Sequence, residues 1–526
     1  MSSIPSTTPV HIADSDLAQT LEGLLPVLER LLPVRFTQGR EAPGDVVARV
    51  TNAVAGHVPS MLSTLVLPAV AEVDAPVAMP IRFADHAAVP WPFRGRTIEA
   101  RAAVDPASPA CRPQPADVIL AWGRNGLPIW TIGTYRGDTV HRTALLPPSA
   151  AGGVDIGLAA AGDRFIQTLP LIHFLRGLTG AQAYANPPLR ASFIIDDPNL
   201  HWPRYGFVDY RQIAAGARRD NYHVAFATIP LDAWWVHRST ADIFRAHPGE
   251  LSLLVHGNDH ARHELAQEIS PRACAQLLRH AHARIRLLEA KSRLEVSRVM
   301  VPPHGACSVR MLAQLPLNGF ESACISAGSL RAHNPGQEWI RSLGFAPAET
   351  VEGCTVLPRW AFDAASETTL LTAAYLGQPL ILRGHHRDLK SGLDILQRFA
   401  RSINGLGDVR WGSLADLTRL NFRQRIVGRT LHVQPMAARI DVTIPDGVEE
   451  LQVDAADALW SVVDEDSAAS LDGRPFTLPA HARTRYSLQA RRPEVIGGDA
   501  IRPRSTGAKL IVRRILTEAR DRLCVS

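Results

Sequence analysis

Cysteine is scarce in this sequence, and its positions argue against two common uses of that residue. The six cysteines are widely dispersed over 526 residues and include no CxxC pair. Neither a disulfide framework nor a thiolate zinc site is therefore predicted. Such a pattern is typical of a reducing compartment.

Long apolar runs are missing as well. No uninterrupted apolar stretch is long enough to span a bilayer. Residues Met1 to Pro5 lack the basic and apolar regions of a signal peptide. We therefore expect a cytoplasmic protein without a membrane partner.

A strong charge of either sign is also absent. The net charge of +5 is the difference between 56 basic and 51 acidic residues, and the basic ones are scattered except in the C-terminal tail. A solvated helix face explains that tail better than a nucleic-acid or membrane surface does, so no nucleic-acid partner is predicted. The clustered residues are Arg502, Arg504, Lys509, Arg513, Arg514, Arg520 and Arg522.

The length of the chain indicates several domains. At 526 residues it exceeds the size at which a single hydrophobic core stops growing. We predict an N-terminal α/β domain of unknown role at 1–188, a parallel (β/α) barrel at 189–423, and a small C-terminal β-sandwich with a terminal helix at 424–526.

The two outer domains show local patterns but no identifiable chemistry. In the first, leucines at helical spacing predict a helix at 17–32, and alternating segments at 129–135 and 140–146 predict a hairpin. In the third, alternation of apolar and polar residues predicts antiparallel sheet, and an amphipathic helix is expected to close the chain. These segments are 431–433, 438–444, 450–453 and the helix 510–523.

Strands and helices alternate in the middle domain, which is the signature of parallel βα units. Parallel βα barrels place their chemistry at the carboxyl ends of the strands, so the residues that follow each strand are the candidates for a site. The predicted strands end at Ile195, Ile229, Val255, Val301 and Leu382, and the predicted helices cover 208–219, 271–291, 311–315 and 389–403.

Two adjacent carboxylates, Asp196 and Asp197, follow the first apolar run of this domain. The two carboxylates of such a pair can have different roles, because one can bind a metal while the other accepts a proton from activated water. A strand-to-loop turn before Pro198 is the alternative use of the pair.

Two imidazoles follow the second apolar run, at 251–255. His256 and His260 form an HxxxH pair, and His263 offers a second usable spacing after His260. With Asp197 they supply the ligands of a divalent metal that activates water. Oxygen and nitrogen ligands without thiolate suit zinc, and also cobalt, nickel or manganese. Ordinary loop histidines are the alternative in a chain that contains 20 of them.

Two further strand ends carry polar residues. After Val301, the run Pro302-Pro303-His304-Gly305 is a rigid wall from which a backbone N–H could face a developing oxyanion, with a plain turn as the alternative. After Leu382, His385 and His386 offer a general acid for a leaving group, with a buried polar network as the alternative.

In their order along the chain, these blocks resemble the motifs of the polysaccharide deacetylases of carbohydrate esterase family 4, the NodB-homology enzymes. The resemblance is confined to the middle domain. It implies a deformed (β/α) barrel that hydrolyses N-acetyl or O-acetyl groups of glycans with a divalent metal, commonly zinc. It also implies roles for the residues: Asp196 is the catalytic base, Asp197, His256 and His260 bind the metal, Pro303 and His304 line the site, and His385 or His386 is the catalytic acid.

The sequence departs from this pattern at two positions. Val301 stands where the family has an arginine that orients the base, and His304 replaces a tyrosine. An active protein must hold Asp196 through another donor, for which His304, Arg359 and Arg387 are the candidates.

The function expected from these residues is metal-dependent removal of an acyl group, first of all acetyl, from an amide or ester. The substrate would be a carbohydrate or a related small molecule. Two alternatives stay open: a non-catalytic glycan- or metal-binding protein on a degenerate barrel, and an amidase acting on a small non-sugar amide.

Overall fold

The computed structural model divides the chain into two compact units. The first comprises Met1–Ala185, Trp339–Ala346 and Ser366–Leu376, and the second comprises Asn186–Glu338, Pro347–Ala365 and Gly377–Ser526. The predicted three-part division is a different partition and stays a prediction. The residues that the structure describes are 7–39, 43–52, 62–68, 75–148, 157, 162–180, 183–339, 343–455, 459–463, 475–490, 512 and 516.

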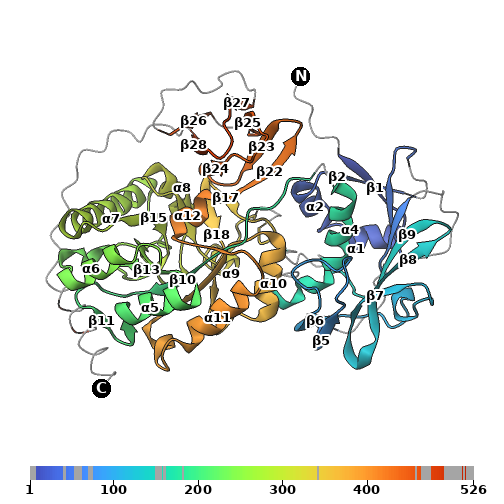
Figure 1. Ribbon diagram of the computed structural model, residues 1–526, viewed down its shortest axis with the longest axis horizontal. Coiled ribbons are helices and arrows are strands. Elements are labelled where there is room, and N and C mark those ends of the chain that lie inside the picture. Colours follow the sequence, from blue (N-terminus) through green and yellow to red (C-terminus); the bar gives the residue numbers. More distant parts are fainter. Residues whose placement is uncertain are drawn as a thin grey trace. The chain divides into compact units, whose positions relative to one another are not determined.

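The first unit contains a nine-stranded mixed sheet with the order β2-β1-β3-β4-β9-β8-β7-β5-β6 (Figure 1). Neighbours run parallel from β2 to β9 and antiparallel from β9 to β6. The strands are β1 (Thr8–Ile12), β2 (Val34–Gln38), β3 (Ala48–Thr51), β4 (Ser63–Val66), β5 (Val77–Phe83), β6 (Thr97–Ala102), β7 (Val118–Trp122), β8 (Pro128–Tyr135) and β9 (Asp138–Thr143). The helices are α1 (Ser15–Leu21), α2 (Leu25–Leu31), α4 (Leu169–Thr179) and α10 (Glu367–Leu376).

Two local predictions in this unit had different outcomes. The hairpin of β8 and β9 forms, and its two turn residues, Arg136 and Gly137, both have the positive φ that a tight hairpin turn requires. The single helix predicted at 17–32 was wrong, because the chain breaks between α1 and α2. Pro26 lies in the first turn of α2, where its missing N–H is tolerated, whereas inside one continuous helix it would clash with the preceding turn.

The second unit is built on a curled, mostly parallel sheet with the order β17-β18-β16-β15-β14-β13-β10-β20-β19, and β21 also pairs with β10. Only the β17–β18 pair is antiparallel. The strands are β10 (Arg190–Asp196), β13 (Val224–Thr228), β14 (Leu251–Val255), β15 (Val296–Met300), β16 (Ser322–Cys324), β17 (Glu349–Val351), β18 (Cys354–Leu357), β19 (Trp360–Ala361), β20 (Leu380–Gly384) and β21 (Arg410–Trp411).

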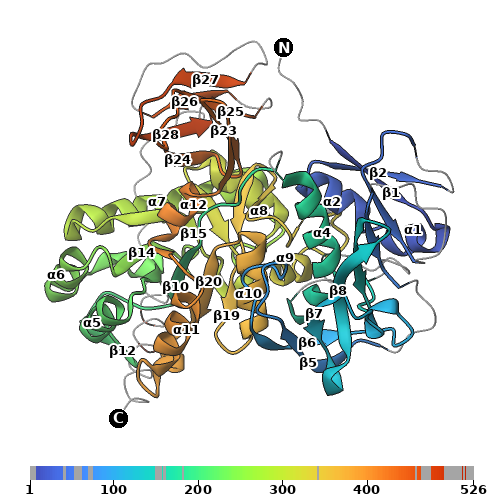
Figure 2. The same cartoon turned by 45° about the vertical axis from the view of Figure 1, so that its right-hand side comes forward.

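Helices α5 (Tyr210–Asp220), α6 (Arg238–Ala246), α7 (Pro271–Ser292), α8 (Val309–Leu317) and α11 (Asp394–Asn404) lie along the outside of this sheet (Figures 1 and 2). The short helix α9 (Ala327–Ala332) follows β16, and α12 (Leu414–Arg419) adds Leu414 and Leu417 to a hydrophobic cluster on the other face of the strands. The predicted βα alternation is therefore present. No pairing within the described residues joins β17 to β19, so the complete barrel stays a prediction.

Burial explains the apolar run Phe193-Ile194-Ile195 in the middle of β10. All seven of its residues are buried, as expected for a parallel strand covered on both faces. One face contributes Ile194 to a cluster that also contains Leu254, Val299, Val301 and Ile381 from neighbouring strands and their ends. The strands are thereby fixed side by side, and their carboxyl ends share one edge.

The C-terminal segment forms two further sheets, β22-β23-β25-β27 and β24-β28-β26, whose buried residues belong to one hydrophobic cluster. The predicted antiparallel pairing is present in four pairs, β22–β23, β25–β27, β24–β28 and β26–β28. The pair of β23 and β25 runs parallel instead, because the chain between them crosses to β24 in the other sheet. The predicted β-sandwich stays a prediction. The strands are β22 (Phe422–Val427), β23 (Thr430–Pro435), β24 (Arg439–Thr443), β25 (Glu450–Val453), β26 (Trp460–Val462), β27 (Phe476–Pro479) and β28 (Arg485–Ala490).

Three sequence predictions can be compared only with the residues that the structure describes. The helix predicted at 510–523 lies outside them apart from Val512 and Leu516. Within the described part of the chain, five cysteines carry free thiols. No helix there combines the length and the apolar composition that crossing a bilayer requires.

Candidate metal centre

Three adjacent strand ends position the candidate ligands. β13 lies between β10 and β14, and all three run parallel, with Asp196 level with Ala227 and Thr228 level with Val255. The backbone N–H of His256 continues this ladder by donating to the carbonyl of Thr228 at 2.9 Å. Because the ladder holds these ends together, the residues that follow β10 and β14 emerge at the same edge.

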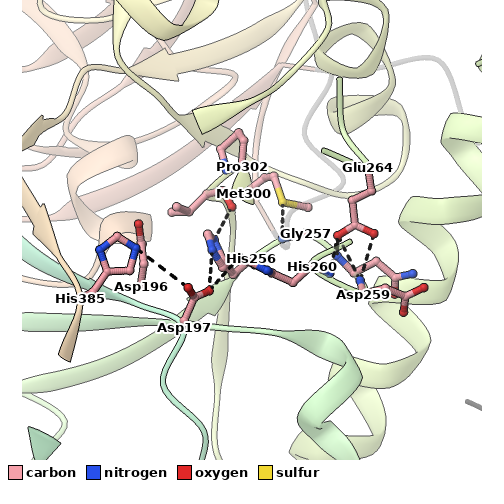
Figure 3. A network of polar contacts seen from close by, with 12 residues as sticks. Asp196, Asp197, His256, Gly257, Asp259, His260, Glu264, Met300, Pro302 and His385 are labelled. Atoms are coloured by element: carbon pink, nitrogen blue, oxygen red, sulfur yellow. Dashed lines mark hydrogen bonds and ion pairs between the residues drawn. The ribbon is translucent and has the colours of Figure 1, made fainter. Parts of the chain in front are cut away.

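Asp197, His256 and His260 converge at this edge (Figure 3). The Oδ1 atom of Asp197 lies 3.1 Å from Nε2 of His256 and 3.0 Å from Nε2 of His260. The three ligand atoms lie within 4.8 Å of one another, and no other cluster of this kind occurs among the described residues. Asp197 adopts a φ of +63°, a left-handed conformation that Asp tolerates better than most residues.

The separation of these atoms fits a divalent ion. Two nitrogen or oxygen ligands that each lie 2.0–2.2 Å from a tetrahedral zinc ion are roughly 3.3–3.6 Å apart, so a small opening of the site is enough. The orientation of His256 fits as well, since its Nδ1 donates to the carbonyl of Val301 at 2.8 Å. That bond fixes the tautomer in which Nε2 has the free lone pair, as in other metal-binding histidines.

Protons can occupy the centre in place of a metal. Burial by itself would raise the pKa of Asp197, but hydrogen bonds and charge from His256 and His260 outweigh it and hold that pKa well below the usual 3.8. Burial would lower the pKa of His256, but the hydrogen bond and charge of Asp197, helped by Asp196, raise it above 6.5. Metal and protons therefore compete for the same lone pairs.

A buried carboxylate holds the loop that carries His260. Glu264 accepts hydrogen bonds from the backbone N–H groups of Asn258, Asp259 and His260 at 2.7, 3.0 and 2.9 Å (Figure 3). Gly257 is required beneath it, because a Cβ there would lie 2.4 Å from Oε1 of Glu264 and 2.6 Å from Cγ of Pro303.

The other side of the loop is held by helix α7. Its buried Arg284 donates to the side chain of Asn258 at 2.7 Å and forms an ion pair with Asp259. The loop is therefore fixed from both sides, which positions His260.

Asp196 lies beside the three ligands but is held by a different partner. It is 3% exposed, and Nη1 of the equally buried Arg359 approaches its Oδ2 to 3.3 Å. Nη2 of Arg359 donates to the carbonyl of Pro302 at 3.4 Å. Of the three donors considered for Asp196, Arg359 is thus the one within hydrogen-bond reach. It follows β18, whereas Val301 points into the hydrophobic cluster of the sheet.

The two histidines after β20 have different surroundings. Nε2 of His385 lies 4.0 Å from Oδ2 of Asp197, and its side chain is 46% exposed. His386 is buried, stacked on Phe207 at 5.9 Å and edge-on to Tyr205 at 5.4 Å. Only His385 therefore faces the metal centre.

The remaining predicted residues line one side of the site. Pro303 is buried against Gly257, and His304 is exposed with a φ of +57°. The N–H groups of Gly305 and Ala306 donate to Pro302 and Pro303 within a turn, so they are not directed toward a substrate.

His263 lies outside the cluster. Its exposed ring contacts that of His304, with centroids 5.0 Å apart, while the His304 ring in turn contacts that of His260 at 4.6 Å. The structure thus brings His260, and not His263, to Asp197.

Comparisons with known proteins give structural matches only. No family model matches the chain, and no curated protein matches it. It is similar to the carbohydrate deacetylase Agd3, at 11% identity over 93% of this chain and 99% of that one, with a TM-score of 0.46.

Two further similar structures cover less than half of the chain. One is a family 4 carbohydrate esterase from Streptomyces lividans in complex with acetate, at 12% identity over 43% of this chain and 93% of that one, with a TM-score of 0.28. The other is BA3943, a family 4 pseudoenzyme from Bacillus anthracis, at 10% identity over 44% and 67% of the two chains, also with a TM-score of 0.28. These are the kinds of protein that the motifs resemble.

Sequence reasoning missed the residues that support the ligands. Glu264 and Arg284 were not singled out, because their roles depend on a chain reversal that places three residues, His260, Arg262 and His263, at positive φ. The only signal was an acidic residue within the histidine-rich block that holds the ligands.

Proposed function

We propose that the protein is a metal-dependent hydrolase that removes an acyl group, most readily acetyl, from an amide or ester of a carbohydrate or related small molecule. The observation that carries this proposal is the arrangement of Asp196. It is a buried carboxylate adjacent to a three-ligand cluster, and a buried arginine holds it. A ligand site alone would need no such neighbour.

Asp197, His256 and His260 would hold the divalent ion, with zinc as the first candidate and cobalt, nickel or manganese as alternatives. When bound, the ion would supply Lewis-acid polarisation of the acyl carbonyl and would make water more acidic. The chain's own residues supply proton transfer and orientation.

Asp196 accepts the proton of the attacking water in this proposal. Arg359 donates to it from the side and fixes the direction of its oxygens. His385 lies beyond Asp197 and is exposed, so it can reach a substrate and protonate the departing amine or alkoxide. The N–H of His304 is the candidate donor to the oxyanion, because the next two N–H groups are used in the turn.

The main rival is a binding protein that holds metal or glycan without turnover. Its best support in the sequence was the missing arginine at position 301. Arg359 supplies a guanidinium to the same carboxylate from another strand end, which favours the enzyme. An amidase acting on a small non-sugar amide would use the same residues, so only substrates can distinguish it.

Two variants test the proposal. Asp196→Asn should keep the metal content and lose turnover by about 10²–10⁴-fold, because it removes a base that is not a ligand. His256→Ala should lose both. Metal content and hydrolysis of acetylated sugars, acetyl esters and simple amides are measured on each.

Equal metal loss in both variants would make Asp196 a ligand. A metal-loaded parent protein without turnover on any of these substrates would favour the binding protein.

A further inference from the structure

Three exposed tryptophans form a continuous patch in the second unit. Trp202, Trp234 and Trp235 are 39%, 46% and 37% exposed. Trp235 contacts both of the others, with ring centroids 5.3 Å from Trp202 and 6.1 Å from Trp234. Tryptophan is usually mostly buried, and contiguous exposed aromatic surface marks a ligand or partner site. We call these three residues the tryptophan patch.

The patch belongs to the edge of the sheet that carries the metal centre. Trp202 lies five residues after Asp197 in the loop that follows β10. Trp234 ends the short helical turn Pro230–Trp234 that follows β13, and Trp235 comes next. Since β13 lies between the two ligand-bearing strands, its loop emerges beside the metal ligands.

Hydrogen bonds connect these loops to one another and to the metal loop. The N–H of Leu231 donates to the carbonyl of Asn258 at 3.0 Å, two residues from His256. The N–H of His237 donates to the carbonyl of Leu200 at 2.9 Å, and Nε2 of His201 lies 3.3 Å from the carbonyl of Asp232. The patch and the metal centre are therefore parts of one bonded set of strand-end loops.

The chemistry of the patch suits a sugar chain. Indole rings offer apolar faces for the C–H faces of pyranose rings, and their N–H groups can bond hydroxyl or acyl oxygens. The buried ring of His201 contacts Trp234 at 4.8 Å and Trp235 at 5.5 Å, which supports both rings from below. Three rings present more surface than one monosaccharide covers.

We propose that the tryptophan patch binds the sugar residues that flank the acylated one. A role of the patch in turnover rests on the proposed function. Binding of glycan by the patch is independent of the proposed function.

Binding without turnover tests the patch independently. In an Asp196→Asn background, the affinity of the full chain is measured by calorimetry for tetramers of β-linked N-acetylglucosamine and of O-acetylated xylose, and for the corresponding monosaccharides. At least one tetramer should bind roughly tenfold or more tightly than its monosaccharide. Trp202→Ala and Trp235→Ala should each weaken that tetramer roughly tenfold.

Two kinds of variant serve as controls. Trp91→Ala removes a tryptophan that is 49% exposed in the first unit, and it should bind the tetramer like the parent. Trp202→Phe and Trp235→Phe keep an aromatic face and should recover part of the affinity, which separates lost stacking from misfolding.

Several outcomes would overturn the proposal. One is tetramer binding no tighter than monosaccharide binding, or none at all. Another is tryptophan variants that bind like Trp91→Ala. A third is tryptophan variants that keep their affinity for the tetramer and lose only self-association or binding to phospholipid vesicles. Absence of hydrolysis with patch-dependent tetramer binding would reject the proposed function and leave the glycan site standing.

Discussion

His385 and His386 are adjacent in the sequence, yet only one of them faces the candidate metal centre. His385 is exposed and faces Asp197, whereas His386 is enclosed by Phe207 and Tyr205. A Cβ on Gly206 would lie 2.3 Å from Nδ1 of His386, which shows how closely the backbone approaches that ring.

His385→Ala should therefore reduce kcat by about 10²–10⁴-fold with little change in the free energy of unfolding, because it removes an exposed proton donor. His386→Ala should lower the free energy of unfolding by roughly 2–4 kcal/mol, because it leaves a cavity between aromatic rings. Steady-state kinetics and denaturant unfolding on both variants provide the measurement. If His386→Ala were fully stable but inactive, the two assignments would have to be exchanged.

The proton balance at the metal centre predicts an effect of pH on stability. In the metal-free protein, the raised pKa of His256 contributes stability that is present below 6.5 and is lost as pH rises through the folded pKa. The lowered pKa of Asp197 contributes stability that is present above 3.8 and is lost only as pH falls through its lower folded pKa. Metal binding requires neutral imidazole, so it strengthens as pH rises.

The difference in thermal midpoint between zinc-loaded and chelator-treated protein should consequently widen between about pH 5.5 and 8. Differential scanning calorimetry at several pH values measures it. In Asp197→Asn, which removes one of the three proposed ligands, zinc should raise the thermal midpoint less than in the parent protein at every pH. A difference that narrows with rising pH in the parent protein would contradict the assignment of these ligands.

At the residue scale, the three residues of the candidate metal centre could be named from the sequence, whereas the residues that support them could not. HxxxH spacing and the adjacent aspartates follow strands, and strand order brings them together. The sequence did not show which of Arg359, His304 and Arg387 donates to Asp196, because the answer depends on where β18 ends relative to β10. Arg359 and Asp196 are 163 residues apart in the sequence.

The loop from His256 to His260 is an element whose shape depends on Glu264. Three backbone N–H groups of the loop donate to this one carboxylate, which compensates for its burial. Removing it leaves those donors without their acceptor and allows His260 to move.

Glu264→Ala should therefore weaken zinc binding by roughly 10–100-fold, the usual effect of losing a group that orients a ligand. Competition with a chromogenic chelator measures the affinity. Glu268→Ala is the matched control, since that carboxylate lies four residues on and its side chain is 93% exposed. Glu264→Gln keeps an acceptor oxygen, so its zinc affinity should lie between the affinities of the two alanine variants. Equal zinc affinities of the two alanine variants would show that Glu264 does not support zinc binding.

At the element scale, five strands of the second unit, β10, β13, β14, β15 and β20, were placed within two residues of their observed ends, because buried parallel strands contain continuous apolar runs. The short strands β16, β17, β18 and β19 were not predicted. Predictions failed where a pattern fits two structures. Alternation in the C-terminal segment indicates a strand but not its partner, and β23 pairs in parallel with β25 across a crossover. The leucines at 17–32 have helical spacing through a proline that divides the helix.

At the scale of the whole molecule, the chain returns to the first unit after entering the second. Residues Ser366–Leu376 belong to the first unit although they lie inside the range predicted for the barrel. Nine of the ten residues of α10 are buried, so this helix has no solvent face and no amphipathic signal. Sequence patterning could not assign it, because a helix that is buried on all sides has no apolar stripe that points to one particular core.

Tyr375 makes the contacts that tie α10 into the first unit. Its ring lies 6.1 Å from Phe93 and 6.0 Å from Phe165, and the guanidinium of Arg176 stacks over it at 4.2 Å. Arg176 also donates to the carbonyl of Tyr375 at 2.8 Å. These contacts join three segments that are far apart in the sequence: the one that contains Phe93, the one that contains Phe165 and Arg176, and α10.

Tyr375→Ala should lower the free energy of unfolding of the first unit by about 3–5 kcal/mol, because it removes a buried aromatic ring from a packed core. Denaturant unfolding followed by tryptophan emission measures the loss, and Tyr375→Phe, which keeps the ring, should stay close to the parent. Zinc content should be unchanged in both variants, since all three ligands lie in the second unit. A variant that lost metal before it lost the fold of the first unit would show that the return of the chain couples the two units, and the metal centre could then not be treated as a property of the second unit alone.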